Sequence, residues 1–205
     1  MSKKDVVPMF PTSEADTGII TTDLAQDLIE TGNAASTGTV NYMKFNKGEW
    51  LFGVDNDEVD DDEIMAVNPA SFTIGWQGWQ DGSPVNGPVV PISRRGELPA
   101  EADLDPIPAG DMNGWGKQLG VSFRSLEDQT PLQFNTTSYG GKQAITKLMK
   151  EVGEGLKAHI EAPVALVKLS SDNYPHKKYG KVWTPVITIV GWADSTGNPV
   201  EKYAA

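Results

Sequence analysis

Cysteine is absent from this chain of 205 residues, which excludes disulfides and thiolate metal sites. Histidine is scarce: His159 and His176 are the only two, which disfavours histidine-based metal sites and histidine-activated nucleophiles. No run of about 18 apolar residues occurs, so we expect no membrane span. The N-terminus, MSKKDVVPMFPTSEAD, lacks the apolar core of a secretory signal, so we expect a cytoplasmic protein.

Positive charge is also scarce, but it is unevenly placed. The chain has 17 Lys and Arg against 28 Asp and Glu, a formal net charge of -11. Residues 1–138 have a net charge of -14, residues 139–183 of +4 and residues 184–205 of -1. Local patches govern docking even where net charge opposes it, so residues 139–183 could still bind a polyanion. Such binding would be weak and steeply dependent on salt.

The sequence offers no complete catalytic or metal motif. In the acidic run DNDEVDDDE, an EF-hand beginning at Asp55 would place Val59 at a ligand position and Asp60 at the glycine position. We interpret residues 55–62 as a solvated loop, with nucleic-acid mimicry or recruitment of a basic partner as the alternative. The stretch SYGGKQAIT fails as a phosphate loop because Thr136 replaces its first glycine and Gln143 follows the lysine. We expect no enzyme activity, no metal and no cofactor.

Patterning divides the chain into an N-terminal arm (1–40) with a short helix after Thr22, one domain (41–195) and a C-terminal tail (196–205). In the domain, a Pro- and Gly-rich stretch (80–117) predicts a long surface loop. Spacing of apolar residues predicts one principal helix over 140–159, capped by Ser138, and Gly153 and Gly155 in its last turns favour an end near Val152. Strands are expected at 49–55, 70–79, 117–128, 162–170 and 182–192, with 130–138 as the partner or the continuation of 117–128.

This order, mainly β with one helix before the last two strands, predicts an OB-fold-like five-stranded barrel with long loops. A generic antiparallel α+β sheet with one helix is the alternative. In the OB-fold, the loop that joins the last two strands helps to frame the oligonucleotide site. Here that loop would be SSDNYPHKKYGK, residues 170–181.

This segment combines cations with aromatic rings, the mixture that single-stranded nucleic-acid binders use to neutralise phosphates and stack bases. Lys142, beside two glycines at the start of the helix, could also contact a phosphate. The candidate nucleic-acid-binding residues are Trp79, Arg94, Arg95, Lys142, Tyr174, His176, Lys177, Lys178, Tyr179, Lys181 and Trp183.

The pieces WLFGVDND, AVNPASFTIGW, SYGGKQAI and SDNYPHKKYGKVWTPVITIVGW resemble phage- or prophage-encoded proteins. Over roughly residues 45–193, the order of elements and the acidic charge are similar to those of phage single-stranded DNA-binding proteins with an OB-fold core. The resemblance implies a role in DNA replication or recombination, in the cytoplasm of the host cell. Such proteins often end in an acidic tail that contacts replication proteins, whereas this chain ends STGNPVEKYAA. The acidic run 55–62 would then have to take that role.

The expected partner is therefore single-stranded DNA, with RNA as the alternative nucleic acid. A homo-oligomer is a further expectation. The competing function is that of a structural or assembly protein of a virion, which would use the N-terminal arm and the long loop to wrap its neighbours.

Overall fold

The computed structural model describes residues 41–107 and 114–203. Residues 41–205 form one compact unit. The predicted N-terminal helix after Thr22 lies outside the described residues.

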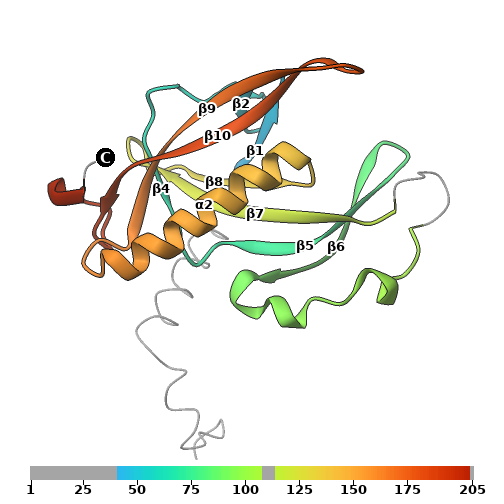
Figure 1. Ribbon diagram of the computed structural model, residues 1–205, viewed down its shortest axis with the longest axis horizontal. Coiled ribbons are helices and arrows are strands. Elements are labelled where there is room, and N and C mark those ends of the chain that lie inside the picture. The colour runs from blue at the N-terminus through green and yellow to red at the C-terminus, as the bar shows by residue number, and fades with distance from the viewer. Residues whose placement is uncertain (1–40, 108–113, 204–205) are drawn as a thin grey trace, which may run out of the picture. The chain divides into compact units, whose positions relative to one another are not determined.

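The described chain is mainly β with one long helix, as the sequence predicts (Figure 1). Three 3-10 helices are short: η1 (Ile92–Glu97), η2 (Glu101–Asp103) and η3 (Glu201–Tyr203). The long helix is α2 (Tyr139–Ala158). The strands are β1 (Asn41–Asn46), β2 (Glu49–Phe52), β3 (Asp57–Glu58), β4 (Met65–Val67), β5 (Thr73–Gln80), β6 (Ser83–Pro91), β7 (Gly116–Ser125), β8 (Pro131–Thr136), β9 (Val164–His176) and β10 (Gly180–Ala193).

All ten strands belong to one strongly curled, open sheet. Its main path runs β10-β9-β4-β7-β8-β1-β2-β3, while β5 pairs with β7 and carries β6 at its outer edge. The pairing of β1 with β8 is parallel, and the other pairings are antiparallel. The structure therefore does not confirm a five-stranded barrel: β1, β3, β4 and β6 are present in addition to the strands that the sequence predicts.

One side chain joins the two ends of the curl. Trp50 on β2 is buried, and its indole N–H donates to the carbonyl of Ser170 on β9 at 2.8 Å. β2 and β9 are far apart in the sheet order, so this bond crosses the open side of the half-barrel. The Trp50 ring also meets Phe45 and Phe134 edge-on, with centroids 5.3 and 4.8 Å apart. Trp50 therefore has two roles: its ring packs in the core, and its N–H group holds the two ends of the curled sheet together.

The helix α2 begins as predicted but ends later. Ser138 accepts a hydrogen bond from the Gly141 amide and caps the first turn. The predicted end near Val152 is wrong, because α2 continues to Ala158. At Gly155 an added methyl group would overlap the ring of Trp192, so the absence of a side chain lets α2 pack closely on β10. Among the described helices, none is long and apolar enough to cross a membrane.

The prediction of a long loop over 80–117 is also wrong in its first third. β6 pairs with β5 along residues 83–91 in spite of Pro84, Pro88 and Pro91. Proline cannot donate to a strand ladder, which confines it to edge strands, and β6 lies at an edge of the sheet. The short helices η1 and η2 then occupy part of the remaining connection.

We predict that Trp50→Phe lowers the free energy of unfolding by about 2 kcal/mol, because it removes the bond to Ser170 and leaves a cavity. Urea denaturation measures the change. Trp115→Phe is the matched control, since the Trp115 indole donates to the Asp105 carbonyl at 2.9 Å but at an exposed position. There water can replace the lost bond, so a loss below about 0.5 kcal/mol is expected. Equal losses for the two variants would contradict the closing role of Trp50.

The two glycines in the last turns of α2, Gly153 and Gly155, give a second matched pair. Gly155→Ala should destabilise the protein by about 1–3 kcal/mol, because the methyl group meets Trp192. Gly153→Ala meets open space and should stabilise the protein by up to about 1 kcal/mol, through helix propensity. Thermal unfolding followed by circular dichroism compares them. A stabilising Gly155→Ala would show that α2 does not pack on Trp192.

Candidate nucleic-acid interface

The segment SSDNYPHKKYGK is not the open loop that the sequence predicts. β9 continues to His176 and β10 begins at Gly180, so most of the segment is paired strand. The register places Tyr174 opposite Val182 and Lys181 opposite Pro175. We call residues 170–183 the basic hairpin. Figure 1 shows it projecting beyond the rest of the sheet. Backbone pairing therefore holds the candidate side chains on a rigid support.

The basic hairpin carries a net positive charge. Its one acidic residue is Asp172, against Lys177, Lys178 and Lys181. Within residues 41–107 and 114–203, no salt bridge involves these three lysines. They remain available to an external anion.

His176 shapes the three-residue turn at the tip. Its Nδ1 accepts hydrogen bonds from the amides of Lys178 and Tyr179, at 3.1 and 3.2 Å. The His176 ring also stacks on the ring of Tyr179, with centroids 4.8 Å apart. These bonds require an unprotonated Nδ1. His176 thus acts on the turn and on the orientation of Tyr179, a role that the composition of the segment does not reveal.

The aromatic candidates differ in how much of each ring is exposed for stacking on a base. Tyr174 and Tyr179 are 44% and 66% exposed. Trp183 is half-buried, and the Lys181 ammonium lies 3.8 Å from its ring centroid. A Cβ at Gly48, in the β1–β2 turn, would come within 2.8 Å of the same ring. Trp183 is therefore placed to anchor the hairpin on that turn, and the tyrosines are the freer stacking surfaces.

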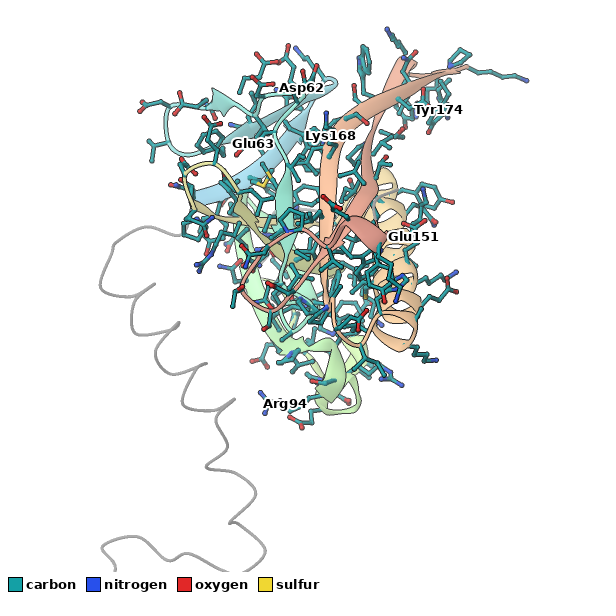
Figure 2. All side chains as sticks on the ribbon, turned by 90° about the vertical axis from the view of Figure 1, so that its left-hand side faces the viewer. Asp62, Glu63, Arg94, Glu151, Lys168 and Tyr174 are labelled. Atoms are coloured by element: carbon teal, nitrogen blue, oxygen red, sulfur yellow. The ribbon has the colours of Figure 1, made fainter. Side chains whose placement is uncertain are left out.

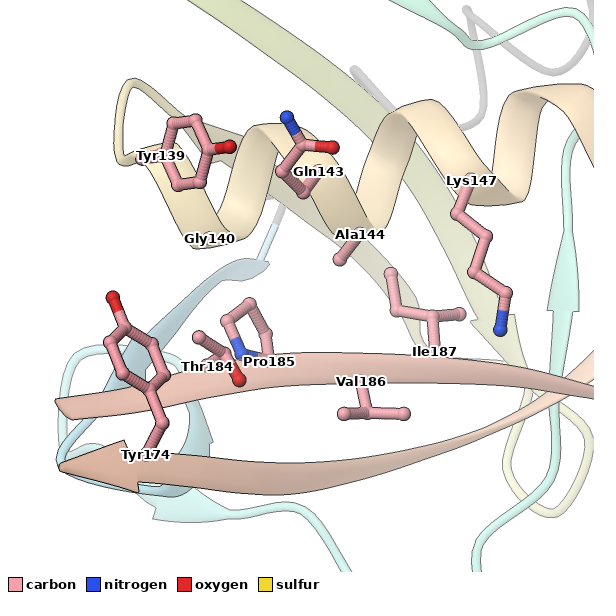
Figure 3. Close-up of a pocket in the computed structure, with 10 residues that line it drawn as sticks. All are labelled: Tyr139, Gly140, Gln143, Ala144, Lys147, Tyr174, Thr184, Pro185, Val186 and Ile187. Atoms are coloured by element: carbon pink, nitrogen blue, oxygen red, sulfur yellow. The ribbon is translucent and has the colours of Figure 1, made fainter.

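A groove separates the first half of α2 from the basic hairpin (Figure 3). Tyr139, Gln143 and Lys147 line it from the helix, and Tyr174 lines it from β9. These three helix residues are four apart and share one face of α2. Lys142 lies on another side of the helix and does not line the groove. Sequence reasoning chose Lys142 and missed Tyr139 and Lys147, although helical spacing could have distinguished them.

The remaining candidates lie elsewhere. Arg94 and Arg95 are on η1, where Arg94 pairs with Glu97 at 3.5 Å. In Figure 2, Arg94 and Tyr174 lie at opposite ends of the described unit. Trp79 is exposed on the β5–β6 hairpin, which pairs with β7 rather than with β9 or β10. The structure therefore does not gather these three residues with the basic hairpin.

The acidic run 55–62 is exposed, except for Val59, which is buried. Asp62 accepts a hydrogen bond from Lys168 on β9 at 2.8 Å, and this bond and the lysine charge lower the pKa of the Asp62 carboxyl. In the described part of the chain, no group of three His, Asp or Glu side chains is placed to hold a metal ion.

We predict that His176→Ala speeds amide hydrogen exchange at residues 178 and 179 about fivefold, the effect of losing a hydrogen bond of about 1 kcal/mol. His176→Asn is the control, since its side-chain oxygen can accept the same bonds in an Asx-turn. NMR-detected exchange measures both. Unchanged rates in His176→Ala would show that the histidine does not hold the turn.

Comparison of the chain with protein-family models, with curated proteins and with solved structures returns no match.

Proposed function

We propose that this protein binds single-stranded DNA without strong sequence preference and acts in replication or recombination of phage DNA. The observation that carries the proposal is the basic hairpin, which presents unpaired lysines and exposed tyrosines together in an otherwise acidic chain. The proposed mechanism needs no bond making. Lys177, Lys178 and Lys181 neutralise phosphates, while Tyr174 and Tyr179 offer ring faces to the bases.

The order of elements lends the proposal further support. The strands β2, β5 and β7 (with β8 as the partner of β7), the helix α2 and the strands β9 and β10 follow the order of an OB-fold-like domain, with β1, β3, β4 and β6 as additions. In that interpretation, the basic hairpin holds the loop between the last two strands. Arg94 and Arg95 would belong to the connection between the second and third strands, but at a distance from the hairpin.

The acidic balance of the chain also has a consequence for binding. The acidic remainder of the surface repels DNA and slows its association with the protein. The affinity then depends on the local contacts that the lysines of the basic hairpin make with phosphates. Affinity should therefore fall as salt screens the lysines. A strand that contacts all three should give a slope of log K against log salt near -2, at about -0.7 per phosphate.

The test uses fluorescence anisotropy of labelled oligothymidine, beginning at 50 mM salt. We predict that Lys177→Glu with Lys178→Glu weakens binding at least tenfold and makes the salt slope shallower by about 1.4, the loss of two phosphate contacts. The control, Lys44→Glu with Lys157→Glu, makes the same charge change at exposed positions outside the hairpin. It should alter affinity much less and preserve the slope.

Three results would count against the proposal. Wild-type protein that shows no affinity at 50 mM salt contradicts DNA binding altogether. Equal weakening by the two double variants would assign the effect to net charge rather than to the basic hairpin. A defined large oligomer without DNA affinity, seen by light scattering, would favour the structural or assembly role instead.

A further inference from the structure

The groove between α2 and the basic hairpin has a volume of about 460 Å³. Its walls come from two elements that are distant in sequence: Tyr139 stands on the first turn of α2, and Tyr174 rises toward it from β9 (Figure 3). The apolar side chains of Ala144, Pro185 and Ile187 also line the groove, and Ala144 and Ile187 lie from the tyrosines toward Lys147 (Figure 3). The groove is therefore open at the surface and lined with rings and aliphatic groups.

The two tyrosines that form the walls of the groove are largely exposed to solvent. Tyr139 is 76% exposed and Tyr174 is 44% exposed, although aromatic side chains gain most when their faces are packed. A flat, partly apolar ring is the ligand whose shape and polarity match two exposed tyrosines and an aliphatic floor. Nucleobases have these properties, and stacking on aromatic side chains is their commonest mode of capture in single strands.

The polar groups of the groove suit a polyanion. Lys147 reaches toward β10 at the far end of the groove from Tyr139, where its ammonium also makes an exposed pair with Glu151 at 3.6 Å. Gln143 lies between Tyr139 and Lys147 (Figure 3). Of the described residues that line the groove, none is acidic, in a chain of net charge -11. Tyr174 also belongs to the basic hairpin, so the groove continues directly from the lysine-bearing segment. A strand held by these lysines would have a base within reach of the groove.

We propose that this groove is a nucleobase subsite, in which a base of the bound strand lies between Tyr139 and Tyr174. Lys147 faces the adjoining phosphate, and the Gln143 amide can meet the polar edge of the base, since it both donates and accepts. The inference rests on the proposed function and extends it from the hairpin to α2. It assigns binding roles to Tyr139, Gln143 and Lys147.

The experiment measures dissociation constants for two labelled strands of equal length, oligothymidine and a base-free (abasic) strand. The proteins are wild type, Tyr139→Ala, Tyr139→Phe and Tyr42→Ala. Tyr42 is the matched control, a 64% exposed tyrosine on β1 that lines neither groove nor hairpin. Both substituted positions are at the surface, and circular dichroism confirms that each variant is folded.

Tyr139→Ala should weaken oligothymidine binding about tenfold and leave the abasic strand unaffected, because only a base can stack. Tyr139→Phe keeps the ring and should stay within about twofold of wild type, as should Tyr42→Ala. The outcomes separate the two proposals. If wild type binds oligothymidine and Tyr139→Ala binds it equally well, the subsite is wrong and DNA binding stands.

Two other results overturn the subsite as well. Equal wild-type affinity for the abasic strand and oligothymidine would mean that bases are not bound and that phosphate contacts alone hold the strand. Wild type that binds neither strand would contradict both the subsite and the proposed function, and a peptide or a second protein would then be the occupant to seek.

Discussion

The contact between Trp50 and the carbonyl of Ser170 is the constraint on which the rest of the structure depends. It ties β2 to β9 across the open side of the curled sheet, at the residue where the basic hairpin begins. Below this point β9 and β10 are held by core residues such as Val167 and Ile187. Above it, Trp183 rests on the β1–β2 turn. The hairpin is thus a stiff extension of the curled sheet, which lowers the entropic cost of ordering it on a ligand.

This architecture also explains how an acidic protein can keep a basic surface. The hairpin from Val164 to Ala193 contains four lysines and one acidic residue. Lys168, near its base, is paired with Asp62 of the acidic run, whereas the lysines at the tip form no salt bridge with a described carboxylate. Distance from the acidic body, rather than a change in overall charge, leaves the tip free to meet an anion. The helix α2 then adds Tyr139 and Lys147 beside it.

Local patterns predicted the elements that depend on local physics. The apolar spacing of Ile145, Leu148 and Val152 gave α2 and its buried face, and Ser138 gave its cap. Propensity could not show that Gly155 is required by the ring of Trp192, so the predicted helix ended too early. It also missed β6, because prolines are tolerated at an edge that exists only once the sheet is assembled. The candidate residues of the hairpin came from composition, whereas helical spacing puts Tyr139 and Lys147 on one face of α2 and the structure shows that this face lies beside β9 and β10.

In the proposed binding mode, a single strand lies along the basic hairpin and α2. The decisive experiment is photo-crosslinking with oligothymidine that carries 5-iododeoxyuridine, followed by mass spectrometry of the peptides. Adducts are expected on Tyr174, Tyr179 and Tyr139. Adducts confined to β1, β2 or η1, or none at all under conditions that saturate binding, would contradict it.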